Sequence, residues 1–179
     1  LIKNNLIRFT NIIIDSKSGY SGAGKKFVKS NIENSEDFNF YNYNTNSHRH
    51  ICEIQQELNK VSNKLVNFSF NPHILPVFRG MMTTIYCDLK DGIELQLIED
   101  TLNSFYINST FVNLLDSNTR GDFFLVQKTN NCFIKIYKHN KNKLIIVSII
   151  DNLLKGGAGQ AVQCLNLLVG IDESISLIN

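Results

Sequence analysis

Two histidines on either side of an arginine are the residues of this sequence best placed to do chemistry. His48 and His50 flank Arg49. Imidazole exchanges protons near neutral pH, and a guanidinium group binds phosphate or carboxylate. Apolar residues recur at helical spacing from Ile51 onward, so we predict a helix that begins at His48 and is capped by Ser47. The positive end of a helix favours neutral imidazole, the form that a general base requires.

A metal site is the competing interpretation of the same segment. If this segment were a strand, His48, His50 and Cys52 would share one face and could ligate a metal. The helical pattern removes this alignment, so we expect no metal. The cysteines of the chain form no C-x-x-C pair, which argues against zinc and against a dense disulfide framework, and for reduced thiols.

Glycine-rich segments are the second chemical feature. The segment from Gly19 to Gly24, followed by Lys25, has the G-x-x-x-x-G-K spacing of a phosphate-binding loop. Lys26 stands where such a loop needs Ser or Thr for its magnesium ion, although Asp151 could imitate the acidic residue of an ATPase. The N–H groups of a glycine-rich turn can also hold an anion without any ATPase chemistry. A plain structural turn is an equal alternative.

The apolar pattern predicts one domain, because 179 residues with 43% hydrophobic content can bury a single core. Expected strands are 11–15, 66–70, 83–89, 123–127, 132–137 and 143–151, and expected helices are 24–29, 48–61, 93–105 and 153–168. Residues 71–80, with two prolines, are expected to be an extended connection. The Asn-rich stretch 39–46 is either an ordered loop or a disordered linker. This order of elements fits an α+β domain with a mixed or antiparallel sheet covered on one face.

Charge and hydropathy exclude several classes of function. The net charge of +2 arises from 18 basic and 16 acidic residues that are mixed along the chain, so we expect no nucleic-acid partner. No apolar run reaches the roughly 20 residues of a membrane span, so we expect a soluble protein. The sequence begins at Leu1 without an initiator Met or a signal peptide, and residues 1–7 read as the tail of a helix. We therefore expect the C-terminal piece of a longer protein.

Taken together, these motifs resemble N-acetyl-gamma-glutamyl-phosphate reductase in family order over nearly the whole chain. The matching segments are Asp15 to Lys25, Tyr43-Asn44 with His48 to His50 and Glu53 to Gln55, Phe70 to Pro76 with Arg79-Gly80, Thr129-Asn130, and Asp151 to Asn166. Aspartate-semialdehyde dehydrogenase shares the Ser-Gly-Ala-Gly loop, but the His-Arg-His segment fits the reductase better. The resemblance implies an α+β domain with a mixed, largely antiparallel sheet covered by helices, the C-terminal domain of the glyceraldehyde-3-phosphate dehydrogenase-like superfold.

The resemblance also implies an activity. N-acetyl-glutamyl 5-phosphate would be reduced by NADPH to N-acetyl-glutamate 5-semialdehyde, with release of phosphate, through a cysteine thioester in arginine biosynthesis. Neither the G-x-G-x-x-G fingerprint of the NADP domain nor the Gly-Cys-aromatic-Pro-Thr segment of the nucleophile is present. We therefore expect this chain alone to be inactive. A homodimer or homotetramer is expected, in the cytoplasm or in the interior of a plastid or mitochondrion.

Roles carry over from the family by position. Residues 1–150 would form the catalytic and oligomerisation domain, and residues 151–179 a C-terminal helix that packs against an N-terminal NADP-binding domain. The expected catalytic residues are His48 and, as the alternative, His50; the expected NADP contacts are Ser21, Gly22, Ala23, Asn152 and Gly156; the expected substrate contacts are Arg49, Lys25 and Arg79. Lys25 replaces the Arg that the family more often has, which keeps the charge but loses bidentate geometry. A phosphate-binding ATPase domain and a catalytically dead interaction domain are the competing hypotheses.

Overall fold

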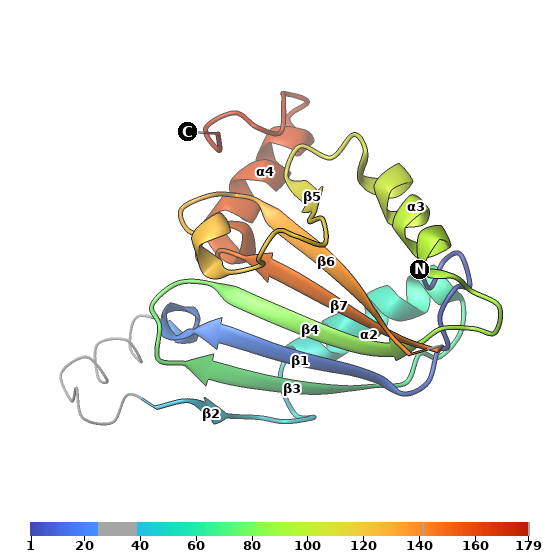
Figure 1. The fold of residues 1–179 in the computed structure, drawn as a ribbon. Coiled ribbons are helices and arrows are strands. Elements are labelled where there is room, and N and C mark those ends of the chain that lie inside the picture. The colour runs from blue at the N-terminus through green and yellow to red at the C-terminus, as the bar shows by residue number, and fades with distance from the viewer. Residues whose placement is uncertain (25–38, 141, 179) are drawn as a thin grey trace.

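A mixed sheet of seven strands organises the chain, in the spatial order β2-β3-β1-β4-β7-β6-β5 (Figure 1). The computed structural model describes residues 1–24, 39–140 and 142–178. The strands are β1 (Ile12–Gly19), β2 (Tyr41–Asn42), β3 (Phe68–Leu75), β4 (Met81–Asp88), β5 (Val112–Leu114), β6 (Cys132–His139) and β7 (Lys143–Ile150). Strand β1 runs parallel to β3 and β5 runs parallel to β6, whereas the other pairs are antiparallel. The predicted mixed, largely antiparallel sheet is confirmed.

The longer helices are α2 (His50–Ser62), α3 (Leu95–Tyr106) and α4 (Gly159–Leu168). Short 3₁₀ turns occupy Tyr20–Ala23 (η1) and Phe123–Leu125 (η2), and a π-helical turn, Leu154–Ala158 (η3), leads into α4. In Figure 1 the chain passes from the edge strand β2 to α2, which lies behind the sheet.

Alternating side chains along the strands build the core between the sheet and helices α2 and α3. Ile12 and Ile14 of β1 point to the covered face and are buried, whereas Ile13 points to the other face and is 48% exposed. The buried cluster is Leu6, Ile7, Ile12, Ile14, Val66, Phe70, Cys87, Leu89, Ile98 and Leu144. The stripe of α2 predicted from its spacing packs against this cluster through Ile51, Ile54 and Leu58. Each fully buried aliphatic side chain contributes about 1.5–3 kcal/mol.

The opposite face of the sheet is only partly covered. Ile13, Tyr86 and Tyr137 lie in one register row across β1, β4 and β6, and all are exposed. Near β5, the loop that leads to η2 covers the face. Lys135 of β6 is buried there and donates hydrogen bonds to the carbonyls of Ser117 (2.9 Å) and Thr119 (2.7 Å). A sheet face with exposed aromatic and aliphatic side chains is available for contact with another protein surface.

Two of the expected elements are wrong. Residues 1–7 form turns rather than the tail of a helix, and Leu6 and Ile7 belong to the core. Residues 123–125 form the turn η2 rather than a strand, because the Asp122 carboxylate accepts the N–H of Phe124 (3.0 Å) and starts a tight turn. A short apolar run does not distinguish these outcomes by its periodicity. The helix expected at 24–29 lies almost wholly outside the described residues.

Segment 71–80 also differs from the expected connection, because β3 continues through Pro72 to Leu75. The backbone nitrogen and carbonyl of one strand residue point the same way, and the Pro72 carbonyl accepts the N–H of Tyr43 (3.1 Å), just past the end of β2. The missing N–H of Pro72 therefore faces the sheet edge and removes no bond to β1. Residues 39–46, left open between loop and linker, contain β2 and a turn.

Helix α4 buries a polar face rather than its predicted apolar stripe. Its buried residues are Gly159, Gln163 and Asn166, whereas Leu165 is 56% exposed and Val169, which follows the helix, is 60% exposed. A Cβ atom at Gly159 would lie 2.4 Å from Asn130 Oδ1, so only glycine allows the helix to approach this closely. The apolar stripe of α4 is left without a partner in the described residues.

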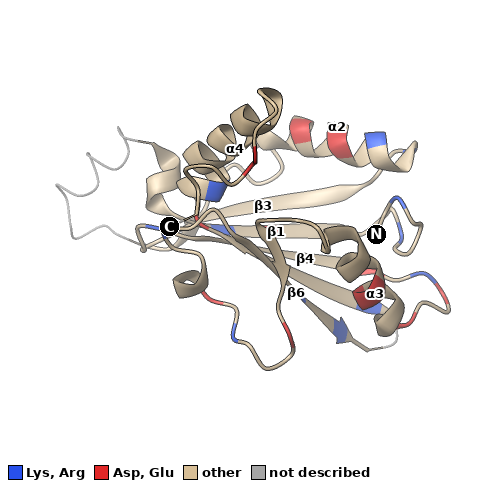
Figure 2. Ribbon diagram, turned by 90° about the horizontal axis from the view of Figure 1, so that it is seen from above, with Lys and Arg blue, Asp and Glu red and all other residues tan. Residues whose placement is uncertain are grey.

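Two global properties follow from the described residues. No helix among them is long and apolar enough to cross a membrane. Figure 2 shows acidic positions on α2 and α3 and basic positions on α2, the strands and the loops, without a continuous basic stretch along the ribbon that is drawn.

Candidate functional site

The turn before α2 is fastened to strand β3, and this places His48. The N–H of Asn46 donates to the Phe70 carbonyl (3.0 Å), and the Asn46 side chain accepts the N–H of Phe70 (3.1 Å). Asn46 has a left-handed φ of 55°, which Asn tolerates better than most residues. The His48 ring packs against the Phe70 ring, with 5.4 Å between the ring centroids. A local sequence of polar turn residues thus sets a catalytic candidate against the core strand.

The His48 side chain itself starts the helix. Helix α2 begins at His50, two residues later than predicted, and Ser47 does not cap it. The Nδ1 atom of His48 accepts the N–H of His50 (3.2 Å), and the His48 carbonyl accepts the N–H of Ile51 (3.0 Å). The ring therefore satisfies one of the N–H groups that a helix start leaves without an internal partner.

His48 and Tyr43 form a pair of neutral groups. The hydroxyl oxygen of Tyr43 lies 3.4 Å from Nε2 of His48. Burial lowers the pKa of His48 below its usual 6.5, and the charges of His50 and Arg49 lower it further. Burial raises the pKa of Tyr43, an effect that the charge of Arg49 partly offsets. At pH 7 the imidazole is neutral and the phenol keeps its proton.

A second group gathers around Asn152, directly after β7. Its Oδ1 atom accepts the N–H of Gly80 (2.8 Å), and its Nδ2 atom donates to Ser21 Oγ (2.8 Å) and to the Gly19 carbonyl (3.3 Å). Ser21 Oγ in turn donates to the Phe78 carbonyl (2.5 Å). The buried Asn152 amide thus joins the end of β1, turn η1 and the start of β4. We call Asp151 and Asn152, with these partners, the 151–152 junction.

Asp151 is fully buried and fully engaged. One carboxylate oxygen accepts the N–H groups of Leu153 (2.8 Å) and Leu154 (3.0 Å), and so starts the turn η3. The other oxygen accepts the N–H of Lys128 (2.7 Å) and faces Nη1 of Arg79 at 3.3 Å. A buried carboxylate needs such partners, because its desolvation costs several kcal/mol. One nitrogen of the Arg79 guanidinium group is therefore paired with Asp151.

Exposed backbone surrounds the junction. Gly22, Ala23 and Gly156 are all exposed, and a Cβ atom at Gly22 would lie 3.0 Å from Ser18 Oγ. The structure therefore brings Ser21, Gly22, Asn152 and Arg79 together, whereas His48, Arg49 and His50 form the separate group at the start of α2. Arg49 is exposed, and Lys25 lies outside the described residues.

Residues 1–152 match a protein family described as semialdehyde dehydrogenase, dimerisation domain. The chain belongs to this family. Its sequence is 39% identical to an N-acetyl-gamma-glutamyl-phosphate reductase of Clostridium beijerinckii over 178 residues, which are 99% of this chain and 52% of that protein. It is 37% identical to a probable chloroplastic N-acetyl-gamma-glutamyl-phosphate reductase of Arabidopsis thaliana, covering 100% of this chain and 45% of that protein. The resemblance found in the sequence is confirmed, and the chain spans about half the length of the curated relatives it matches.

Solved structures confirm the fold of this semialdehyde dehydrogenase dimerisation domain. Aspartate semialdehyde dehydrogenase II from Vibrio cholerae superimposes with a TM-score of 0.70 at 18% identity, over 94% of this chain and 57% of that chain. The ATPase hypothesis loses support, because Asp151 is bound by Arg79 and by backbone N–H groups.

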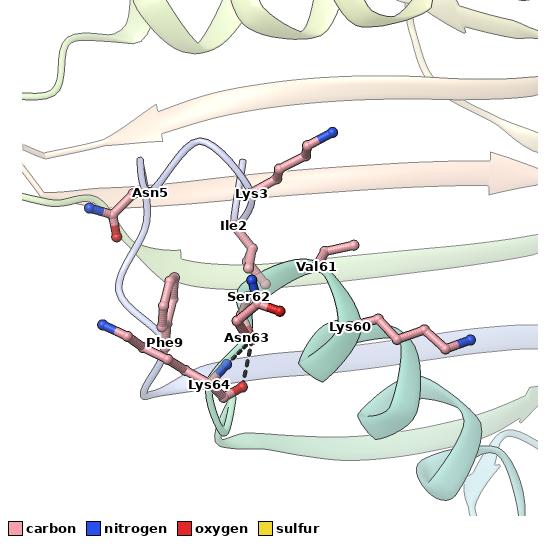
Figure 3. Close-up of a pocket in the computed structure, with 9 residues that line it drawn as sticks. All are labelled: Ile2, Lys3, Asn5, Phe9, Lys60, Val61, Ser62, Asn63 and Lys64. Carbon is pink, nitrogen blue, oxygen red and sulfur yellow. Dashed lines mark hydrogen bonds between the residues drawn. The ribbon is translucent and has the colours of Figure 1, made fainter.

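Two hollows in the described part of the surface lie away from the predicted residues. One of about 560 Å³ lies between the N-terminal turn and the end of α2, and Figure 3 shows Phe9, Ser62 and Lys64 at its wall. A larger and mostly apolar hollow of about 1010 Å³ lies beside α3, with Leu58, Ile85 and Leu102 among its lining. Neither lining includes a predicted site residue, and no group of metal-ligating side chains occurs within residues 1–24, 39–140 and 142–178.

Sequence reasoning missed two contributors to the site. Tyr43 entered only as part of a family pattern, and its contact with His48 arises from the turn at Asn46. Asp151 entered as an imitation of an ATPase carboxylate and as the first residue of the family segment 151–166, although an acidic residue at the end of the apolar run 144–150 signals a buried and partnered charge. A search for polar residues beside buried strands would have found Asp151, but not Tyr43.

Proposed function

We propose that this chain is the C-terminal part of an NADP-dependent N-acetyl-gamma-glutamyl-phosphate reductase. The observation that carries the proposal is the His48-Arg49-His50 group, which presents a neutral imidazole beside an exposed guanidinium. Two relatives that the chain matches over about half of their own length are named as this reductase. The reaction would reduce N-acetyl-glutamyl 5-phosphate to the semialdehyde with loss of phosphate, as a step of arginine synthesis in the cytoplasm or a plastid.

The residues of this chain would manage protons and charge in that reaction. Acyl transfer to a thiolate expels phosphate, and the departing group needs a cation and a proton. Arg49 would bind the acyl phosphate, since a guanidinium matches two phosphate oxygens at once. His48 and His50 would exchange protons with the thiol and with the developing alkoxide. The thiol itself would come from the half of the relatives that this chain does not cover.

Exposed backbone at the junction fits a dinucleotide cofactor. When bound, NADPH supplies the hydride that converts the thioester to the semialdehyde. Gly22 and Ala23 would contact it on one side and Gly156 on the other, because all of them leave backbone open. Asn152 is engaged on both ends of its amide, so its part would be to hold Ser21 in place.

Two further surfaces would complete the enzyme. The open sheet face that carries Ile13, Tyr86 and Tyr137 would contact a second copy of the chain, in line with the dimerisation-domain family. The exposed stripe of Leu165 and Val169 on α4 would pack against the NADP-binding half. Burial of such apolar side chains stabilises an interface by about 25 cal/mol per Å² before the costs of association are subtracted.

The test of the proposal is turnover of the complete reductase with His48→Gln. Loss of one acid–base group lowers turnover by roughly 10²–10⁴-fold. His139→Gln is the matched control, because His139 is an exposed histidine at the end of β6. Equal turnover of both variants would assign the proton transfer to His50 or remove it from this domain altogether.

A further inference from the structure

The N-terminal turn closes with the hydrogen bonds that end a helix. The N–H of Leu6 donates to the carbonyl of Leu1 (3.1 Å), and the N–H of Asn5 donates to the carbonyl of Ile2 (2.9 Å). Asn5 has a left-handed φ of 58°. A six-to-one bond around a five-to-two bond, with a left-handed fifth residue, is the Schellman motif that caps a helix C-terminus. Residues 1–6 therefore have the geometry of a helix end, although they form only turns themselves.

The apolar contact that often accompanies this motif is present as well. It joins the first and the sixth residue of the motif. Leu1 packs against the buried core cluster that contains Leu6. The turn is thus held against the sheet at the place where the capped helix would end.

The sheet beside this turn has an apolar face without a covering element in the described residues. The hollow of about 1010 Å³ lies there, with Leu58 of α2 and Leu102 of α3 in its walls. Its floor includes Ile14, Ile85 and Ile146, which are neighbours in register across β1, β4 and β7. Figures 1 and 2 both show the N-terminus between α2 and α3. An apolar sheet face between two helices is suited to a third helix in the same layer.

The two ends of the hollow give the direction and the length of such a helix. At one end, burial lowers the pKa of the Leu1 amino group, which also interacts with Cys87. At the other end the lining includes Cys132. Leu144 pairs with Cys87 and Ile150 pairs with Cys132, so the ends are six steps of β7 apart. That is about 20 Å, which a helix covers with about 13 residues.

We propose that the residues directly before Leu1 in the complete reductase form a helix of about 13 residues that fills this hollow, begins near Cys132 and ends in the turn 1–6. The inference rests on the proposed function, because it requires a longer protein of which this chain is the C-terminal part. The 178 matched residues are 52% of the Clostridium beijerinckii relative, so a segment of this length is available. The helix would join the two halves of the enzyme through a packed core rather than a linker.

The chemistry of the hollow defines the helix face that it accepts. The floor of isoleucines requires apolar side chains at helical spacing, because polar groups buried there would lack partners. Ser148 lines the hollow together with Cys132, and the two side chains contact each other at 3.5 Å. A second copy of the chain or a small apolar molecule could fill the same volume. Neither of these occupants would account for a helix cap at Leu1.

Photo-crosslinking in the complete reductase tests the helix and its direction. The label p-benzoyl-phenylalanine replaces either Val61 or Phe105, which line the hollow and are 47% and 70% exposed, so the core stays intact. Val61 lies near the end of α2 beside the N-terminal turn, and Phe105 precedes Tyr106, which interacts with Cys132. We expect the label at 61 to react within about two turns before Leu1, and the label at 105 within the third or fourth turn.

The same label in place of Asn103 is the matched control. Asn103 lies on α3 and is exposed, but it does not line the hollow. Mass spectrometry of the crosslinked peptides reads the positions. Products between two copies, the reverse order of the two sites, or a yield at 105 no higher than at 103 would overturn the proposed helix.

Turnover of the unlabelled complete protein separates this inference from the proposed function. Crosslinks in the expected order without reduction of N-acetyl-glutamyl 5-phosphate would support the helix and contradict the proposed function. Turnover with crosslinks elsewhere would contradict the helix and support the function.

Discussion

The His48 group and the 151–152 junction are both built from polar residues at the ends of strands, yet they are held in different ways. Asp151 and Asn152 are buried, and every polar atom of their side chains meets a partner in the chain. His48 and Tyr43 are only partly buried, and they meet at the long distance of 3.4 Å. The junction fixes chain segments to each other, while the side chains of the His48 group remain partly exposed. Buried and saturated groups position a site, and partly open groups act in it.

The largest expected loss of stability follows from removal of the buried charge at the 151–152 junction. Asp151→Ala would leave Arg79 and the N–H groups of Lys128, Leu153 and Leu154 without their acceptor. Loss of one partner of a buried ion pair costs about 3–5 kcal/mol. We expect this decrease in the free energy of unfolding in urea titrations. Asp172→Ala, at an exposed carboxylate that accepts hydrogen bonds from Ser174, is the control. A loss at Asp151 as small as at Asp172 would contradict the buried role.

A smaller loss is expected from the amide of the junction. Asn152→Ala removes the acceptor of Gly80 N–H and the donor to Ser21, which costs about 1–3 kcal/mol when a buried group is left unsatisfied. Amide hydrogen exchange should show Gly80 losing protection. Asn103→Ala, on the exposed side of α3, should leave both the stability and that protection unchanged. Retained protection at Gly80 would show that Asn152 does not join these segments.

Thiol reactivity sharpens the comparison without changing the fold. Cys52 on α2 is exposed, whereas Cys132 is part-buried and Cys87 is buried. Burial raises the pKa of the Cys87 thiol to about 11, and burial also raises the pKa of Cys132, although Ser148 offsets part of that rise. Since the thiolate is the nucleophile, we expect iodoacetamide at pH 8 to modify Cys52 at least about tenfold faster than either. Peptide mass spectrometry provides the rates, and similar rates at Cys87 and Cys52 would contradict the burial.

The smallest expected effect is the pH dependence that His48 adds to stability. The folded pKa of His48 is lowered below 6.5, so both states are neutral above that pH and no difference arises there. As the pH falls through 6.5, the unfolded chain takes up the proton first, and stability decreases until the pH passes the folded pKa. His48→Gln should remove this part of the decrease. Urea midpoints of both proteins at about pH 7.5 and pH 5 measure it, and parallel slopes would contradict the shift.

Periodic elements could be predicted from the sequence, and elements that depend on distant partners could not. The stripe Ile51, Ile54 and Leu58 identifies α2, because a buried helical face repeats every three or four residues. The continuation of β3 through Pro72 requires knowledge that its nitrogen faces the sheet edge. The turn η2 requires the Asp122 cap, which competes with the strand pattern of the same residues. Local periodicity predicts neither the continuation of β3 nor the turn η2, since each is decided by a hydrogen bond.

The candidate site divides in the same way. The His-Arg-His segment is visible in the sequence, because imidazole and guanidinium are chemical signals on their own. The contact between Tyr43 and His48 is not visible, because it needs the left-handed turn at Asn46 and the bonds of that turn to Phe70. Likewise, Asp151 meets Arg79 only because β7 ends beside the turn that precedes β4.

The sequence by itself determined the family, the mixed sheet, the core stripe of α2 and the residue types of the site, because side-chain chemistry and local periodicity are written in the order of residues. The tertiary structure alone decided the contact of His48 with Tyr43, which oxygen of Asp151 meets Arg79, and which side of α4 is buried. These outcomes depend on distances between segments as far apart as Gly19 and Asn152. Hydrogen bonds act over about 3 Å, so only the folded chain can choose their partners.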